Sequence, residues 1–231
     1  NFEHIPPKSA FNKLGIKLYD YFEYLSKNNI KYLNLQKGLG KHTLCYDCNS
    51  LTGAWYGTAY AEFAMQGLKY YSQNISENLV LPYTIYPLRV FKQIISCFAS
   101  INGSKWCKKN PQIKKFLLNR YEKIFPTDIE IRMYMQTENR SKISGIKSLI
   151  NIKTGEIFVG SEFAYTPFGF ICICDKYNTN FNVLNELYSV TDFLNYNYDD
   201  KVTLFINMPR KPCNPTTLDF RDKVPFIGRK K

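Results

Sequence analysis

Two cysteines on a short turn form the first group in this sequence whose spacing suits a metal. Cys45 and Cys48 are separated by a tyrosine and an aspartate, and Asn49 follows at the expected start of a helix. A Cys-x-x-Cys turn forms one half of many structural zinc sites, because this spacing lets two thiolates meet one tetrahedral ion. The other two ligands are expected from a cysteine pair upstream of this chain or, with a less usual spacing, from Cys97 and Cys107. A redox role would need a thioredoxin-like βαβ setting, which the sequence lacks, and two incidental cysteines are the remaining alternative.

An acidic residue and a histidine stand together near the start of the chain. Glu3 and His4 lie just before two prolines, and residues before proline avoid the helical region, so an extended stretch is expected here. The only other histidine is His42, three residues before Cys45. We therefore expect the two stretches to belong to one site.

Taken together, the two stretches resemble the HNH endonucleases, also called His-Me finger or ββα-metal nucleases. The resemblance covers residues 1–70, and the residues that carry it are Glu3, His4, Cys45, Cys48, Asn49 and Gly53. In that family the acid–histidine pair ends a β-strand, the asparagine lies on the facing helix, and half of a zinc clamp precedes the first strand. The resemblance therefore implies an N-terminal ββα-metal module whose first cysteine pair lies upstream of Asn1.

The resemblance also implies a role for each residue. His4 would be the general base, Glu3 and Asn49 would be ligands of a catalytic Mg²⁺ or Mn²⁺, and Cys45 and Cys48 would hold a structural Zn²⁺. These roles suit the residue types, because a neutral imidazole can take a proton from water and hard oxygen ligands favour Mg²⁺ or Mn²⁺. The implied activity is metal-dependent hydrolysis of DNA phosphodiester bonds, with RNA open as a substrate and with restriction or anti-phage defence as a compatible setting.

The sequence departs from the family pattern in three places. The gap between the two signatures is longer than usual, and a helix is expected over 17–28. The central asparagine that orients the base in the family has no clear match. Lys41 and His42 occupy that region instead, and both are candidates for contact with nucleic acid. His42 could bind phosphate, hold a metal or simply lie on the surface. Glu3 also stands where Asp or His is more usual.

A lysine-rich stretch is the second candidate for contact with nucleic acid. Its cations lie next to Trp106 and comprise Lys105, Lys108, Lys109, Lys114, Lys115 and Arg120. Phosphates can bind such a stretch and bases can stack on an aromatic ring, although a solvated helix face explains the pattern equally well. Arg89 and Lys92 are expected to extend the same basic surface.

Composition supports a polyanionic partner. The chain has 31 Lys and Arg against 19 Asp and Glu, a formal charge of +12, which favours nucleic acid. No apolar run is long enough to cross a membrane, and no membrane partner is expected. The odd number of cysteines, with irregular spacing, favours a cytoplasmic protein over a disulfide-bonded secreted one. A protein partner or a homo-oligomer remains open.

The hydrophobic pattern changes from helical to strand-like along the chain. Beyond 17–28, helices are expected over 49–71, 87–100, 110–120 and 184–195. Strands are expected over 129–136, 144–152, 154–165, 168–175 and 201–209, with a connector between Pro82 and Pro87 and an irregular tail after 209. The expected fold class is α+β. Residues 1–75 form the HNH-like module in this prediction, and residues 76–231 form a helical connector plus an antiparallel α+β domain for target or partner recognition.

Two further functions remain as alternatives to a nuclease. One is a zinc-stapled nucleic-acid-binding protein without catalysis, since such modules can persist without activity. The other is a protein-interaction subunit whose basic surface only keeps it soluble. Salt-dependent binding to DNA would separate the last reading from the other two.

Overall fold

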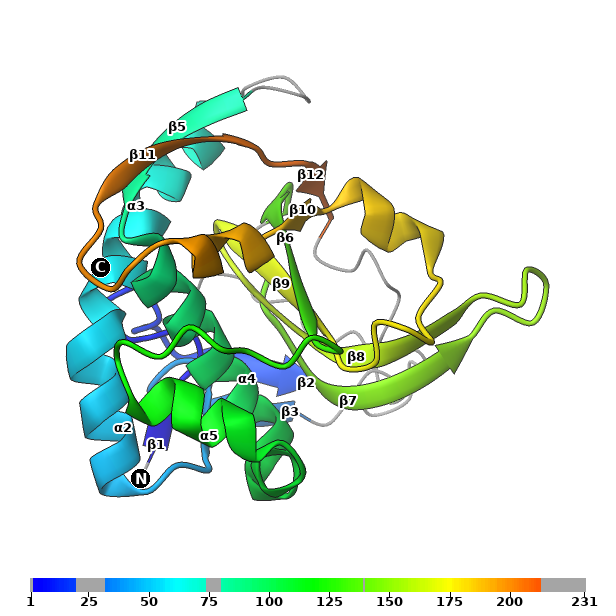
Figure 1. Cartoon of the computed structure of the whole chain (residues 1–231), viewed down its shortest axis with the longest axis horizontal. Helices are drawn as coiled ribbons and strands as arrows, with labels where there is room; N and C mark the ends of the chain where they lie inside the picture. Colours follow the sequence, from blue (N-terminus) through cyan, green and yellow to red (C-terminus); the bar gives the residue numbers. More distant parts are fainter. Residues whose placement is uncertain (1, 20–31, 74–79, 139, 213–231) are drawn as a thin grey trace.

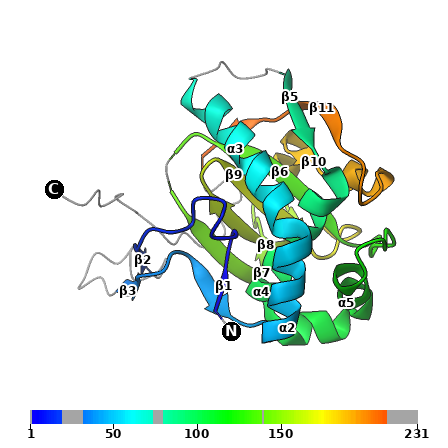
Figure 2. The same cartoon turned by 90° about the vertical axis from the view of Figure 1, so that its left-hand side faces the viewer.

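The fold is that of a computed structural model, which describes residues 2–19, 32–73, 80–138 and 140–212 (Figure 1). Helices and strands both contribute to it, so the predicted α+β class is confirmed. One central helix, α4, lies between a mainly antiparallel sheet and a second layer built from the N-terminal segments (Figures 1 and 2).

The N-terminal segment forms a two-stranded ribbon followed by a long helix. Strand β1 (Phe2–His4) pairs antiparallel with β4 (Gly40–His42). Helix α2 (Tyr46–Thr52) then continues through the π-helical turn η1 (Gly53–Gly57) into α3 (Thr58–Ser72). The helix predicted over 49–71 is therefore confirmed, although it begins three residues earlier.

The segment between β1 and β4 contains a second ribbon in place of a predicted helix. Strand β2 (Ile16–Tyr19) pairs antiparallel with β3 (Tyr32–Leu35), and the Tyr19 and Tyr32 rings lie 5.7 Å apart. The helix predicted over 17–28 is wrong at 17–19, because cross-strand aromatic contacts stabilise a strand pairing that no local period reveals. Residues 20–28 of that prediction lie outside the described part of the chain.

Another ribbon joins distant parts of the sequence. Strand β5 (Val80–Ile85) pairs antiparallel with β11 (Val202–Asn207), which confirms the strand predicted over 201–209. The connector predicted between Pro82 and Pro87 is wrong, since Pro82 pairs with Phe205 inside this ribbon. A two-stranded ribbon has open edges where the missing proline N–H does no harm.

Two helices follow β5. Helix α4 (Pro87–Lys109) begins with the predicted proline and runs nine residues beyond the predicted end, with non-helical backbone at Gly103 (φ 78°). Helix α5 (Pro111–Leu118) confirms the short helix predicted within 110–120. Most of α4 is buried as far as Ile101, which makes it the central element of the packing.

The second half of the chain builds the main sheet, in the order β10-β6-β9-β8-β7, with β12 parallel to β6. Its long strands confirm the four predicted from the strand-like pattern: β6 (Glu130–Gln136), β7 (Lys142–Ile150), β8 (Ile157–Tyr165) and β9 (Phe168–Ile173). Two short strands complete it, β10 (Tyr188–Ser189) and β12 (Arg210–Lys211).

The α-helix predicted over 184–195 is wrong. Two short 3₁₀ helices, η2 (Asn182–Glu186) and η3 (Thr191–Asn195), flank β10 there. The backbone between them pairs with β6, and this sheet contact interrupts the helical pattern. Residues 210–211 of the predicted irregular tail form β12, and residues 213–231 lie outside the described residues.

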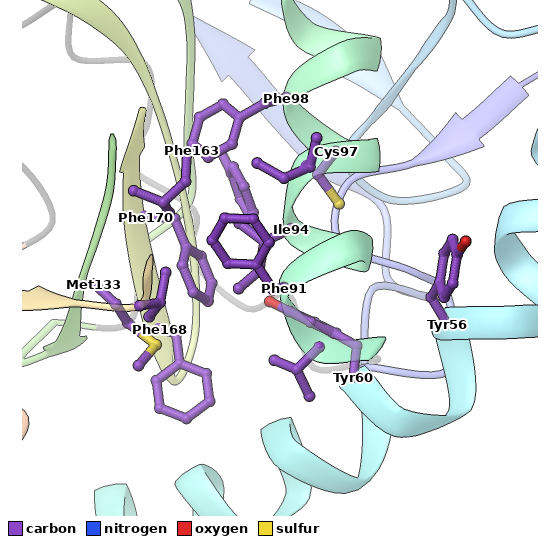
Figure 3. Packing of buried hydrophobic residues seen from close by; sticks show 14 of the residues in the cluster. Tyr56, Tyr60, Phe91, Ile94, Cys97, Phe98, Met133, Phe163, Phe168 and Phe170 are labelled. Carbon is purple, nitrogen blue, oxygen red and sulfur yellow. The ribbon is translucent and has the colours of Figure 1, made fainter. Parts of the chain in front are cut away.

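Aromatic side chains join α4 and α3 to the sheet. Phe98 of α4 meets Phe163 edge-on at 5.1 Å (Figure 3). Phe63 of α3 stacks on Phe168 at 4.4 Å. Offset-stacked and edge-to-face pairs such as these contribute beyond simple area burial. The same core cluster includes residues from both sides of residue 75, and the predicted domain boundary there stays a prediction.

Candidate metal and nucleic-acid site

The β1–β4 ribbon presents its functional residues on two faces. Successive strand residues point to opposite sides, and Glu3 faces α4, where Ser96 Oγ donates to its Oε1 at 3.4 Å. Lys41, directly opposite Glu3, also reaches α4, because its Nζ donates to the Ile101 carbonyl at 3.2 Å. His4 points to the other face of β1, where it contacts Phe2, two residues earlier on the same strand. The sequence pair Glu3-His4 is thus divided between an inner and an outer face.

Glu3 is a buried carboxyl group with an unusual pKa. Only 4% of the residue is exposed, and burial raises its pKa to about 7, against the opposing effect of hydrogen bonds with Ser100 and Ser96. Its second oxygen, Oε2, has no hydrogen-bond partner among the described residues. A buried acceptor without a donor calls for an explanation such as a water or a cation. Oε2 of Glu3 therefore has lone pairs available for a metal ion.

His4 is half-buried on the outer face. Its pKa is lowered by burial and by the nearby charge of Lys8, so the imidazole is neutral at neutral pH. Its Nδ1 has no hydrogen-bond partner within the described segments. The Phe2 ring lies 5.0 Å from His4 and 5.2 Å from His42, so both histidines of the chain flank one aromatic ring. His42 itself is exposed.

The cysteine turn starts α2 as expected. Cys45 is the N-cap residue, and its sulfur accepts the Cys48 N–H at 3.3 Å. The hydrogen bond between the two thiols lowers the pKa of Cys45 and raises that of Cys48 to about 11. Asn49, half-buried, lies on the first turn of the same helix. The two sulfurs therefore stand together, with Asn49 one residue further on.

A cavity of about 330 Å³ opens beside this turn, between α2 and the α4–α5 junction. Its lining includes Cys45, Cys48 and Cys107, together with Lys108 and Lys114. The alternative zinc ligands Cys97 and Cys107 are divided by this cavity. Cys107 lines it, whereas Cys97 is fully buried and does not.

The described residues fit the implied metals only in part. Within the described ranges, no three His, Cys, Asp or Glu side chains are grouped so that they could hold an ion. The paired thiols suit one half of a zinc site, and the unpartnered Oε2 of Glu3 suits one ligand of a hard cation. His, Cys, Asp and Glu side chains alone therefore complete neither the zinc site nor the Glu3 site. The Glu3 site would also need an amide ligand such as Asn49, or bound water.

Five exposed lysines surround the α4–α5 junction. This lysine elbow consists of Lys105, Lys108 and Lys109 of α4 and Lys114 and Lys115 of α5. Trp106 is 6% exposed, so it packs in the core and offers no stacking surface beside these lysines. Lys92 is fully buried and donates to the Asn119 carbonyl at 3.0 Å, so the expectation that it extends the basic surface is wrong.

Sequence reasoning missed the residues that surround Glu3. Ser96 and Ser100 face it from α4, and the Ser100 hydroxyl is also hydrogen-bonded to the Thr43 hydroxyl. Both serines are buried in an otherwise apolar helix and stand four residues apart, hence on one face. Two serines four residues apart in an otherwise apolar helix are therefore the sequence signal that could have predicted a buried polar partner for α4.

Comparison of the chain with models of known protein families, with curated proteins and with solved structures finds no match. Of the helices in the described ranges, none combines the length and apolar character that a membrane span requires.

Proposed function

We propose that this chain is a metal-dependent endonuclease of the HNH type that hydrolyses phosphodiester bonds of DNA, in a restriction or anti-phage setting. The observation that carries the proposal is the order of elements around the motif residues. Strand β4, paired antiparallel with β1, leads into α2, and the β2–β3 ribbon lies in the sequence between the two strands. Glu3-His4 lies on β1, and Cys45, Cys48 and Asn49 lie at the helix start. This order supports the resemblance seen in the motifs. The net charge of +12 supports a polyanionic substrate.

Glu3 and Asn49 would hold the catalytic cation. Bound there, Mg²⁺ or Mn²⁺ would supply stabilisation of the negative charge that develops on the phosphate and the leaving oxygen. The free Oε2 of Glu3 supports its role as a ligand. A pKa of about 7 leaves a substantial ionised fraction at neutral pH, and a bound cation would increase it.

His4 would take the proton from the attacking water. Its lowered pKa keeps the imidazole in the neutral form that can accept a proton at neutral pH. The ring contact with Phe2 and a backbone hydrogen bond with Asn12 orient the imidazole, and its Nδ1 has no hydrogen-bond partner among the described residues. Cys45 and Cys48 would fix the start of α2, and thereby Asn49, through a structural zinc ion.

A binding module without catalysis is the second candidate, and one observation favours it. Glu3 and His4 lie on opposite faces of β1, and Glu3 bonds with Ser96 in the manner of a structural buried carboxyl. In that case the lysine elbow would carry the function, and the ribbon would only support it.

Cleavage of supercoiled plasmid with Mg²⁺ or Mn²⁺ separates the two. The wild-type chain, with any natural upstream residues, is compared with His4→Ala and with the matched variant His42→Ala. All three proteins are brought to the same zinc content. Nicking or linearisation by the wild type that is lost in His4→Ala supports the nuclease. Retention in His42→Ala would place His42 outside the reaction, and a weaker reaction there would indicate a phosphate or metal contact. Salt-dependent DNA binding with no cleavage by any of the three proteins supports the binding module. A parallel RNA substrate tests the choice of sugar.

A further inference from the structure

An exposed tyrosine ring is held in place on the surface after α5. Tyr121 is 58% exposed. The Arg120 guanidinium lies 4.8 Å from its ring centroid, and the Tyr198 ring meets it edge-on at 5.6 Å with an interplanar angle of 72°. These contacts fix the ring orientation while much of the ring surface still faces solvent. An ordered exposed ring loses little further entropy when a ligand stacks on it.

Tyr198 is itself anchored from several sides. Its hydroxyl donates to the Trp55 carbonyl at 3.1 Å, and the Arg89 guanidinium lies 4.0 Å from its ring centroid. Arg89 is also 4.3 Å from the Tyr86 centroid and bonds to Asp199 at 2.6 Å. The turn before β11 and the segment after α5 therefore meet in one surface beside the start of α4, where Arg89 contacts Tyr198 and Asp199.

Cations alternate with aromatic rings along this surface. Lys201 lies 5.1 Å from the Tyr86 centroid, and Arg120 is exposed while also 5.5 Å from that of Tyr198. We call the set the aromatic band; it consists of Tyr86, Arg89, Arg120, Tyr121, Tyr198 and Lys201. Tyr121 is the exposed ring that offers stacking for a base, whereas Tyr198 is buried and supports it from within the fold. The cations offer charge for phosphates.

The aromatic band continues into the lysine elbow. Lys115 of α5 bonds to Glu122 at 2.9 Å, immediately after Tyr121, and it remains exposed. Its neighbour Lys114 lines the cavity that contains Cys45 and Cys48. A basic path therefore leads from the exposed ring to the start of α2.

From this arrangement we infer that the aromatic band binds single-stranded nucleic acid. A base stacks on Tyr121, and the adjoining phosphates contact Arg120 and the lysine elbow. The exposed ring is the reason for a single strand, because duplex bases are already stacked on each other and present no free face. The inference extends the proposed function by naming a binding surface, and it is independent of hydrolysis since neither stacking nor ion pairing needs a metal.

Fluorescence anisotropy of labelled oligothymidine, without added Mg²⁺ or Mn²⁺, tests the inference. The full chain is compared with Tyr121→Ala, with Tyr121→Phe, and with Tyr177→Ala, which alters a tyrosine of similar exposure (74%) away from the band. We expect Tyr121→Ala to weaken binding about 5- to 150-fold, the range for loss of one stacked base. Tyr121→Phe and Tyr177→Ala should bind as the wild type does.

Two competitors complete the experiment. Unlabelled oligodeoxyuridine or oligouridine should displace the probe more readily than a duplex of equal length, and the stronger of the two identifies the sugar, because they differ only in the 2′-OH. Equal affinity of Tyr121→Ala and wild type, or better competition by the duplex, would overturn the inference. Failure of plasmid cleavage with intact, Tyr121-dependent binding would remove the nuclease proposal and leave this inference standing.

Discussion

Replacing Glu3 by glutamine tests the buried carboxyl most sharply, because its pKa links its burial to stability. The pKa is raised from 4.5 to about 7, chiefly by burial. A carboxyl whose pKa is higher in the folded state destabilises the fold as pH rises through the interval between the two values. At about 1.4 kcal/mol per pH unit, ionisation of Glu3 lowers the free energy of unfolding by about 3 kcal/mol above pH 7. Below pH 4.5 it has no effect.

Glutamine keeps the size and the hydrogen bonds of Glu3 and removes the charge. We therefore expect Glu3→Gln to stabilise the fold by about 3 kcal/mol at pH 8 and to leave it nearly unchanged at pH 4.5. Urea unfolding of both proteins at several pH values measures the difference, with Glu138→Gln as a control on a more exposed carboxyl. Added Mn²⁺ should stabilise the wild type at pH 8 and not Glu3→Gln, because only the carboxylate attracts the cation. A pH-independent difference would refute the reasoning.

Three further predictions concern the sheet and the lysine elbow. Gly169→Ala should cost about 1 to 3 kcal/mol in urea unfolding through overpacking, because a Cβ there would lie 1.9 Å from Cζ of the buried Tyr134; an unchanged midpoint would contradict this. Lys142→Met should cost about 3 to 5 kcal/mol by leaving Glu162 charged and buried, since the two bond at 2.7 Å with no exposure; adding Glu162→Leu should recover most of the loss. Lys114→Gln should lower the salt dependence of DNA binding by about one ion, and an unchanged slope would exclude a phosphate contact at this residue.

Secondary structure was predictable where one period dominates. The strands β6 to β9 alternate in hydrophobicity or form short apolar runs, and the helix after Cys45 carries an apolar stripe, so local pattern and tertiary burial agree. Residues 184–195 also have helical spacing, but their centre pairs with β6. The backbone partner of a short strand cannot be read from its own sequence, and the same limit explains the errors at 17–19 and at Pro82.

The candidate site was predictable in its motifs and less so in its surroundings. Cys45 caps α2 because its side-chain sulfur accepts the N–H of Cys48, three positions later, as other N-cap side chains do. The partners of Glu3 lie more than ninety residues away on α4, and no local pattern connects them with β1. Trp106 and Lys92 also look exposed in a basic stretch, yet packing between α4 and its neighbours buries both.

A crystal structure of the chain soaked with Mn²⁺, with anomalous diffraction, tests the central claim most directly. The account predicts a manganese peak about 2.1 Å from Oε2 of Glu3, the distance typical of small hard cations and carboxylate ligands, with Asn49 or water completing the shell. A Glu3 carboxyl that keeps Ser96 as its partner, with no anomalous peak beside it, would contradict the claim that Glu3 is a metal ligand.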